Sequence, residues 1–483
     1  MNEVSMLIGG QDRAASNGAT FDRLDPVAGV VASRAPAATL EDADAAVEAA
    51  ARAFPGWSAL TPSERRARLL KAADIMDART GDFVAAGIPE TGATPNWYGF
   101  NVHLAANMLR EAAAMTTQID GSVIPTDTPD NLALAVRQPC GVVLGIAPWN
   151  APVILGTRAI AMPLACGNTV VLKASEACPA VHRMIGTVLQ QAGLGDGVVN
   201  VVTNVPEDAA AIVERLIAHR AVRRVNFTGS THVGRIIAMH AARHLKPALL
   251  ELGGKAPALV LDDADLDAAV EAIAFGAFFN QGQICMSTER IIVHRGVADE
   301  LVERLEGKAR TLVAMAPTRA GAKLGALVDM RAAQRIAALV EDARGHGANI
   351  RAGGAIDGAI MQPTIVDEIT RKMKLYSEES FGPVVTVQRV DSDDEAVAAA
   401  NDSEFGLSAA VFSRDIARAL NVAKRVESGI CHINGPTVHD EAQMPFGGLK
   451  GSGYGRFGSN ASIAEFTDLR WITVQTGKRR YPI

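Results

Sequence analysis

The sequence of 483 residues has no apolar run long enough to cross a membrane. Its longest apolar stretches, such as Gly141–Ala147 and Ala272–Phe279, fall well short of the roughly 20 residues that a membrane-spanning helix needs. The first residues, Met1–Val4, show no basic segment followed by an apolar one, so we expect no secretory signal. These absences predict a protein that has no membrane partner.

Cysteine is scarce, and its spacing argues against the usual disulfide and zinc frameworks. The five cysteines are an odd number, and none belongs to a C-x-x-C pair. Scattered single cysteines are typical of reduced thiols, so we expect a cytoplasmic protein. The ten histidines include no H-E-x-x-H pair, and we expect no metal site. The cysteines are Cys140, Cys166, Cys178, Cys285 and Cys431.

Aromatic residues are few, and the charge is nearly balanced. Aromatic residues make up 5% of the chain, the net charge is −6, and no long run of Lys or Arg occurs. We therefore expect no nucleic-acid partner. What the chain has in quantity is glycine, with 44 residues, and enough length for roughly two to four domains.

The first third of the chain favours amphipathic helices. One is predicted over Leu40–Phe54, where Asp42 and Asp44 lie early enough to suit the helix dipole. Another is predicted to begin after Thr61, because Thr61 and Glu64 have the spacing of a capping box.

From Gly141 the pattern changes to short β-rich runs that alternate with helical segments, which indicates βαβ units in a parallel sheet. Ligands of such sheets bind at the carboxyl ends of the strands. The predicted strands are Gly141–Ile146, Thr169–Lys173, Val198–Val202, Arg224–Phe227 and Ala248–Leu252, and the predicted helices are Ala180–Ala192, Glu207–His219 and His232–His244.

The same alternation restarts after Gly253, so we predict an α/β fold with two parallel-sheet domains. The first comprises residues 1–120 and 139–252, and the second comprises residues 253–447. Residues 121–138 and 465–483 are predicted to form a small β hairpin that pairs with a neighbouring subunit. The second set of strands is Ala258–Leu261, Ile291–His294, Val384–Val390 and Ala409–Phe412, and its helices are Asp265–Phe279, Met330–His346 and Asp394–Asn401.

Cys285 stands out among the cysteines because of its surroundings. It ends the segment Phe278–Cys285, just past a predicted helix, in a polar turn that contains glycine. A single cysteine is commonly a small buried apolar residue, which is the interpretation we favour for Cys166 and Cys431. A cysteine in a polar loop is more typical of a reachable thiolate.

Two polar residues stand at the ends of predicted strands. Glu251 lies among leucines, where burial would raise its pKa toward that of a general base, although an ion pair with a nearby lysine is an equal alternative. Asn150 follows Pro148 and Trp149, and its amide suits a developing oxyanion. On that tripeptide alone, an ordinary Asx-turn is the favoured interpretation.

Further polar features follow strands in the same region. Lys173 and Glu176 suit the hydroxyls of a cofactor, although a lysine at a strand end is more often simply solvated. The segment Gly229–Gly234 lies between a strand and a helix, where a pyrophosphate binds in dinucleotide sites. It departs from the G-x-G-x-x-G pattern, so alone it is weak evidence.

In combination, these features resemble the aldehyde dehydrogenase superfamily over nearly the whole chain. Leu250–Pro257 and Phe278–Cys285 match the glutamate and cysteine signatures of that family at their usual separation. The remaining family segments follow in order: Pro148–Asn150, Lys173 with Glu176, Phe227–Ser230, Glu379–Pro383 and Pro445–Gly448.

The resemblance implies oxidation of an aldehyde to its acid, with a cofactor-binding first domain and a catalytic second domain. Cys285 would be the nucleophile, Asn150 and the Cys285 N–H would hold the oxyanion, and Glu251 would activate the water that hydrolyses the thioester. Lys173 is carried over with this catalytic group as well as with the cofactor site.

The resemblance also implies a dinucleotide cofactor. A carboxylate at Glu176 binds the adenosine ribose and repels a 2′-phosphate, so NAD is expected, with NADP as the lesser alternative. The family's cofactor residues fall here on Trp149, Lys173, Glu176, Gly229, Ser230, Glu379 and Phe381.

Within the family, Trp97–His103 and Gly435–Glu441 resemble the salicylaldehyde and vanillin dehydrogenase subgroup. An aromatic aldehyde is therefore expected. Arg158 would meet a ring hydroxyl or pair with an acid, and we favour the pair. The expected substrate residues are Trp97, Tyr98, Arg158 and Phe446.

Three alternatives remain open. The same chemistry could act on aliphatic aldehydes or semialdehydes, although a semialdehyde would require a cationic clamp that is not evident. A thiol esterase without redox function would leave the cofactor residues idle, and a non-catalytic binding protein would be expected to lack Cys285, Glu251 or Asn150. The family's habit implies a homodimer or homotetramer.

Overall fold

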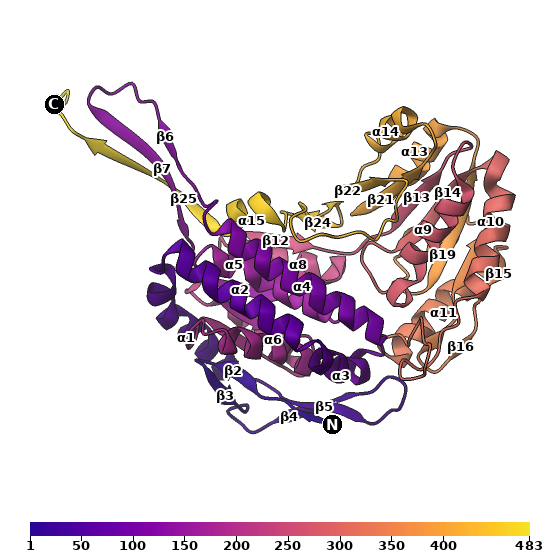
Figure 1. Ribbon diagram of the computed structural model, residues 1–483, viewed down its shortest axis with the longest axis horizontal. Coiled ribbons are helices and arrows are strands. Elements are labelled where there is room, and N and C mark those ends of the chain that lie inside the picture. The colour runs from indigo at the N-terminus through magenta and orange to yellow at the C-terminus, as the bar shows by residue number, and fades with distance from the viewer.

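The computed structural model describes residues 1–483, which form two lobes and a projecting arm (Figure 1). Each lobe contains one large, mainly parallel sheet covered by helices, as the predicted α/β fold requires. No helix combines the length and the apolar character needed to cross a membrane.

The first lobe is built on an eight-stranded sheet of order β24-β12-β11-β8-β9-β10-β2-β3. Its five central strands are parallel and confirm the predicted alternation to within a few residues. They are β8 (Val142–Ile146), β9 (Thr169–Lys173), β10 (Val199–Val202), β11 (Val222–Thr228) and β12 (Ala248–Glu251). The edge strands are β2 (Met6–Ile8), β3 (Gln11–Arg13) and β24 (Gly453–Tyr454).

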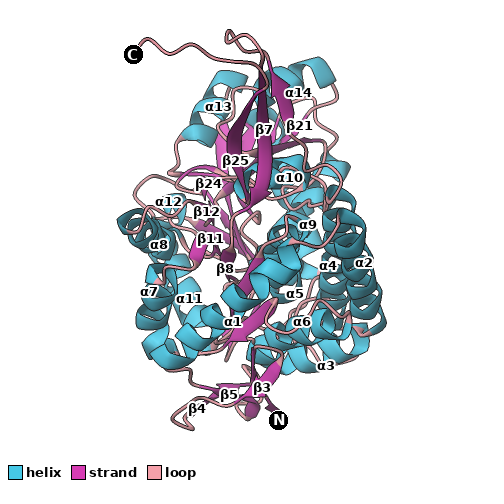
Figure 2. Ribbon diagram, turned by 90° about the vertical axis from the view of Figure 1, so that its left-hand side faces the viewer, coloured by secondary structure: helices cyan, strands magenta, loops and turns pink.

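Helices cover both faces of this sheet (Figure 2). Because side chains alternate along a strand, Val143 packs with the helices of one face, whereas Val142 and Leu144 pack with those of the other. The first face carries α2 (Pro62–Ala78), α4 (Pro95–Met115), α5 (Pro152–Ala165) and α6 (Pro179–Gln191). The opposite face carries α1 (Leu40–Ser58), α7 (Ala209–Ala218) and α8 (Thr231–Arg243), while α3 (Thr80–Thr91) packs beside α4 and α6.

The helix starts follow the capping chemistry of the sequence. The predicted capping box at Thr61 is confirmed, since the Thr61 hydroxyl accepts from the Glu64 N–H and the Glu64 carboxylate accepts from the Thr61 N–H. A second box at Thr39 and Asp42 begins α1. Helix α5 was not predicted, because all its residues are buried and the sequence therefore lacks an amphipathic period.

The second lobe contains a seven-stranded sheet of order β15-β18-β19-β14-β13-β21-β22. The strands predicted from the sequence are all present in it. Its strands are β13 (Ala256–Val260), β14 (Thr288–His294), β15 (Asn349–Ala352), β18 (Thr364–Asp367), β19 (Val384–Val390), β21 (Ser408–Phe412) and β22 (Ile430–Ile433). Its helices are α9 (Leu266–Phe278), α10 (Arg295–Arg310), α11 (Met330–Gly345), α12 (Lys374–Ser377), α13 (Asp393–Asn401) and α14 (Ile416–Ala423).

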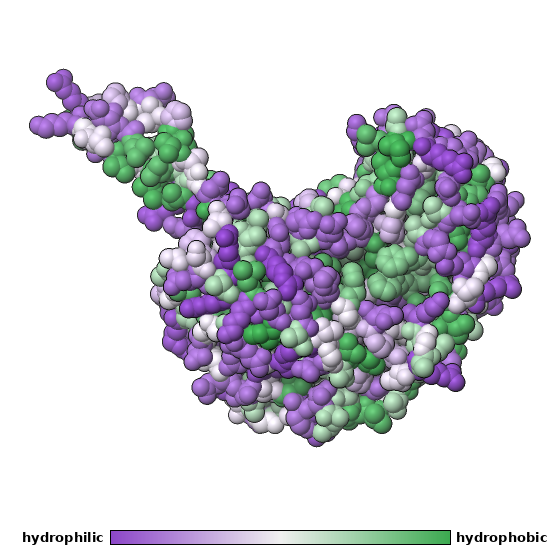
Figure 3. Space-filling view, viewed as in Figure 1, coloured by the Kyte–Doolittle hydropathy of each residue, from purple (hydrophilic) through white to green (hydrophobic).

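The arm is a three-stranded sheet that projects from the first lobe and ends near the C-terminus (Figure 1). The predicted pairing is confirmed: Leu132 lies opposite Val474 and Gln138 lies opposite Asp468. Apolar side chains of the arm are exposed and form a patch on its surface (Figure 3). The strands are β6 (Ser122–Ile124), β7 (Asn131–Pro139) and β25 (Thr467–Gln475), and the exposed apolar residues include Val123, Ile124, Leu132 and Leu469.

Between the second lobe and β25, the chain returns to the first lobe, where Gly453–Tyr454 pairs with the end of β12. Helix α15 (Ser459–Glu465) leads from there into β25. The remaining short elements are β1 (Asn2–Glu3), β4 (Thr20–Leu24), β5 (Val31–Pro36), β16 (Ile356–Asp357), β17 (Ile360–Met361), β20 (Phe405–Gly406), β23 (Leu449–Lys450) and the 3₁₀ helices Pro206–Asp208 and Phe279–Gly282.

Candidate active site

Cys285 lies just past α9, behind a turn whose backbone is held in an unusual conformation. Asn280, Gln281 and Gly282 have φ values of 48°, 56° and 68°, in the left-handed region. A Cβ at Gly282 would stand 2.0 Å from the Gly382 carbonyl oxygen, so this position requires glycine. The Gln281 side-chain amide donates to the Ala326 carbonyl at 2.7 Å and fixes the turn. The thiol is thus presented by rigid backbone.

Cys285 stands where two cavities meet. A cavity of about 320 Å³ on one side is lined by residues such as Trp149, Glu251 and Glu379, and an apolar cavity of about 290 Å³ lies on the other side. Asn150, Leu155 and Cys285 line both cavities. A group bound in either cavity can therefore reach the thiol.

The electrostatics around Cys285 oppose its ionisation. Burial raises the pKa of the thiol well above its usual range, and the neighbouring Glu251 carboxylate raises it further. The Arg158 guanidinium acts in the opposite direction. Cys285 is therefore a partly exposed thiol, and Arg158 offsets only part of the rise in its pKa.

Glu251 ends β12 and is fully buried, with both carboxylate oxygens lacking a hydrogen-bond partner. Burial raises its pKa to about 8, and Arg158 offsets part of that rise. The adjacent Cys285 thiol also favours the carboxylate, although without a hydrogen bond of normal geometry. The alternative of an ion pair with a nearby lysine is wrong, because Lys255 pairs with Glu289. A buried acid with this pKa suits a general base.

Asn150 lies at the carboxyl end of the first sheet, just before α5. Its side-chain amide donates to the Gln283 carbonyl at 2.9 Å, a residue distant in sequence, so the local Asx-turn interpretation is wrong. An amide nitrogen carries two hydrogens, and the second is not used in this contact. The backbone carbonyl of Asn150 accepts from the Trp97 indole at 2.9 Å. Asn150 is therefore fixed beside Cys285 with a hydrogen to donate.

The expected cofactor residues line a continuous groove at the ends of the strands. Glu379, Phe381 and Ser230 line the cavity next to Cys285, whereas Lys173 and Glu176 line a second cavity of about 470 Å³. The residues common to both cavities, which join them, are Pro148, Trp149, Thr228 and Gly229.

Two details of this groove suit a dinucleotide. Ser230 is the N-cap of α8, where backbone N–H groups and the helix dipole favour a phosphate. Lys173 is buried and pairs with Glu176, so it is not a solvated strand end, and the Asn204 amide donates to the same Glu176 carboxylate at 2.9 Å. These contacts hold a carboxylate ready to accept from ribose hydroxyls.

The apolar cavity has aromatic walls. Trp97 stacks with Phe100 at 5.7 Å between ring centroids and meets the edge of Phe279 at 5.0 Å. Phe275 and Phe446 also line it. Flat aromatic surfaces of this kind form a slot that fits a planar ring.

Tyr98 corrects one expectation from the sequence. It is fully buried, lies outside the cavity, and its hydroxyl is 2.9 Å from the Thr91 hydroxyl. Tyr98 follows Trp97 on α4 and points about 100° further round the helix axis, where it packs into the protein interior instead of lining the cavity. Phe100 and Phe279, which sequence reasoning missed, carried a signal: Trp97 with Phe100, and Phe275 with Phe279, have the spacing of one helix face.

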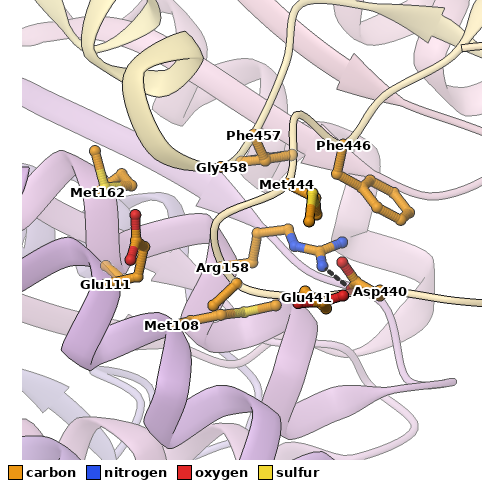
Figure 4. Close-up of a pocket in the computed structure, with 12 residues that line it drawn as sticks. Met108, Glu111, Arg158, Met162, Asp440, Glu441, Met444, Phe446, Phe457 and Gly458 are labelled. Carbon is orange, nitrogen blue, oxygen red and sulfur yellow. Dashed lines mark hydrogen bonds and ion pairs between the residues drawn. The ribbon is translucent and has the colours of Figure 1, made fainter. Parts of the chain in front are cut away.

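Arg158 is a charged residue of the aromatic cavity. Figure 4 shows it from a neighbouring pocket, where its guanidinium points toward Asp440. It pairs with Asp440, and both side chains are largely buried, so the favoured interpretation of an ion pair with an acid is confirmed. Its guanidinium also lies over the Phe446 ring, 4.2 Å from the centroid. Oδ1 of Asp440 has no hydrogen-bond partner.

Comparison with known proteins finds close similarity over the whole chain. The family model for the aldehyde dehydrogenase family matches residues 13–472. Vanillin dehydrogenase from Pseudomonas fluorescens is 68% identical over 484 residues, with 100% of each chain covered. A benzaldehyde dehydrogenase [NAD(+)] from Pseudomonas putida is 38% identical over 469 residues, covering 97% of this chain and 96% of that one.

A solved structure adds similarity at the level of the fold. Salicylaldehyde dehydrogenase from Pseudomonas putida, complexed with salicylaldehyde, superposes with a TM-score of 0.98 at 47% identity and with 100% of both chains covered.

Proposed function

Because this chain belongs to the aldehyde dehydrogenase family, we propose that it oxidises aromatic aldehydes to carboxylic acids with NAD. The observation that carries this proposal is the position of Cys285, at the junction of a dinucleotide-sized groove and an aromatic-walled cavity. In this position the aldehyde and the hydride acceptor would reach the same thiol from opposite sides.

The chemistry begins when the Cys285 thiolate adds to the aldehyde carbon. The Asn150 amide and the Cys285 backbone N–H donate to the oxygen that becomes negative, and their fixed positions lower the cost of forming that charge. NAD held beside Glu379 and Phe381 would supply the hydride acceptor, so that loss of hydride from this carbon would re-form the carbonyl as a thioester on Cys285.

Glu251 completes the cycle by taking a proton from water, which attacks the thioester carbon and expels the thiolate. Its carboxylate oxygens have no protein partner, so they are free to accept from that water. A glutamate at this position supports hydrolysis to a free acid over transfer of the acyl group to another thiol.

The groove supports NAD over NADP. Glu176 is oriented by Lys173 and Asn204, and Glu207 lines the same cavity, so a 2′-phosphate would meet negative charge. Glu379 and Phe381 lie nearer Cys285, where they fit the nicotinamide riboside. The relative named as an NAD(+) enzyme supports the same choice.

The aromatic cavity supports substrates of the benzaldehyde, salicylaldehyde and vanillin type. Arg158 is the only Lys or Arg that lines it, and Asp440 already neutralises that charge. The carboxylate of a semialdehyde would therefore lack a free cation, which argues against the semialdehyde alternative. A thiol esterase would leave the cofactor groove without a role.

The exposed apolar patch on the arm supports the expected homodimer or homotetramer, since an apolar surface of that kind suits a neighbouring copy. The five unpaired cysteines support a cytoplasmic protein.

The test is NAD reduction, followed by absorbance, with benzaldehyde, salicylaldehyde, vanillin, hexanal and succinic semialdehyde. We expect kcat/KM to be about tenfold higher for the aromatic members, because ring packing contributes on the order of 1 kcal/mol per aromatic contact. Trp97→Leu should remove most of that preference, whereas the control Tyr98→Phe, outside the cavity, should retain it. A preference for hexanal or the semialdehyde in the unmodified protein would overturn the assignment of substrate class.

A further inference from the structure

A buried ion pair joins three segments of the active site. The Lys255 ammonium lies 2.5 Å from the Glu289 carboxylate, and the two side chains are only 1% and 3% exposed. Lys255 follows Glu251 by four residues, and Glu289 follows Cys285 by four residues. The pair thus links the chain segment of the proposed base to that of the nucleophile.

The Glu289 carboxylate also contacts a third segment, the Glu379–Phe381 loop. The Ser380 N–H donates to both carboxylate oxygens at 2.9 Å, and the Phe381 N–H donates to Oε1 at 3.0 Å. The two residues that flank Ser380 line the groove beside Cys285. The buried carboxylate therefore accepts hydrogen bonds from the backbone of the proposed nicotinamide site.

This loop needs an anchor, because its backbone is strained. Phe381 has φ of 47°, a left-handed conformation that costs about 1 kcal/mol or more for a residue with a side chain. On its other side, the Glu379 carboxylate accepts from the Gly254 N–H at 2.8 Å. The Arg335 guanidinium donates to the Ser380 carbonyl at 2.5 Å.

A plain stabilising role does not explain the arrangement. Taking two charges out of water is costly, and well-packed apolar residues often replace a buried pair without loss of stability. Here the anion has a second task that an apolar residue cannot perform, since two backbone N–H groups would lose their acceptor.

We propose that Glu289, neutralised by Lys255, is a positioning residue that holds the Glu379–Phe381 loop in the shape that binds the nicotinamide riboside. The inference rests on the proposed NAD-dependent function. Glu289 does not touch substrate, and it acts only through Glu379 and Phe381.

The test compares two matched double variants, Lys255→Met with Glu289→Gln and Lys255→Met with Glu289→Met. Both lack the ion pair and have side chains of similar length, but only glutamine retains an acceptor for the loop. We expect the KM for NAD to be at least tenfold higher in the methionine variant than in the glutamine variant. The rate of Cys285 alkylation by iodoacetamide, measured without NAD, should agree within twofold between them.

Equal KM values for NAD in the two folded variants would overturn the proposal, because a merely structural pair predicts no difference. If the methionine variant does not fold, Lys255→Met with Glu289→Ala replaces it in the same comparison. Quenching of tryptophan fluorescence by NAD, with Trp149 in the groove, gives the binding constant directly. If the wild-type protein binds NAD but oxidises no aldehyde, only the proposed function is refuted. If the wild-type protein does not bind NAD, the proposed function and the positioning role of Glu289 are both refuted.

Discussion

The buried carboxyl of Glu251 makes a sharp prediction about how activity depends on pH. Its pKa is raised to about 8, chiefly by burial, and it acts as a base only when ionised. With that pKa, about 1% of the carboxyl is ionised at about pH 6 and about half at about pH 8. Hydrolysis of the thioester should therefore accelerate about 50-fold across this interval. With its ordinary pKa, Glu251 would be almost fully ionised at both values, and the rate would be flat.

The assay must separate hydrolysis from the earlier steps, because the pKa of the Cys285 thiol is raised as well. Rapid mixing of enzyme, NAD and aldehyde gives a burst of reduced NAD for acylation and a steady state for hydrolysis. We expect Glu251→Gln to retain the burst and to lower the steady-state rate about 10²- to 10⁴-fold, the range for loss of a general base. The pH dependence of hydrolysis should disappear in this variant.

The same group predicts an effect on stability. The folded-state pKa of Glu251 lies above its unfolded value of 4.5, so the protein loses stability as pH rises between that value and about 8. At about pH 7 the cost is on the order of 3 kcal/mol, and Glu251→Gln removes it. The Tm advantage of the variant should grow from about pH 5 to about pH 8. A constant Tm difference, or a steady-state rate that is flat with pH, would refute the assignment of a perturbed carboxyl.

Two further predictions concern the nucleophile and the cofactor. Cys285→Ala should abolish turnover while NAD still quenches the fluorescence of Trp149, and near-normal oxidation in this variant would contradict covalent catalysis. Glu176→Gln keeps an acceptor for the ribose but removes the negative charge, so the preference for NAD over NADP should fall about tenfold in kcat/KM. The matched control Glu207→Gln, on the rim of the same cavity, should change that ratio less, and an unchanged ratio in both variants would remove Glu176 from cofactor selection.

The sequence by itself determined the alternation of strands and helices, and it pointed to the residues proposed to react. Strands such as Thr169–Lys173 and Val384–Val390 were predicted with their observed ends, because buried parallel strands are short β-branched runs bounded by turns. The pairing of Leu132–Gln138 with Leu469–Gln475 was also predictable from two strand-like runs that had no other partner. Cys285 and Glu251 were proposed from their local surroundings and the order of the family segments.

Only the tertiary structure decided what these residues contact. Whether Glu251 is free or paired depends on where Lys255 points. Lys255 pairs instead with Glu289, which comes from β14. Asn150 bonds to Gln283 across the two lobes, which no local pattern of turn residues encodes. The aromatic cavity likewise lies between α4 and the end of α9. Phe100 and Phe279 therefore line it, whereas the Tyr98 hydroxyl contacts Thr91 outside it. Local sequence sets backbone periodicity, whereas side-chain partners distant in the chain are fixed only when packing brings the segments together.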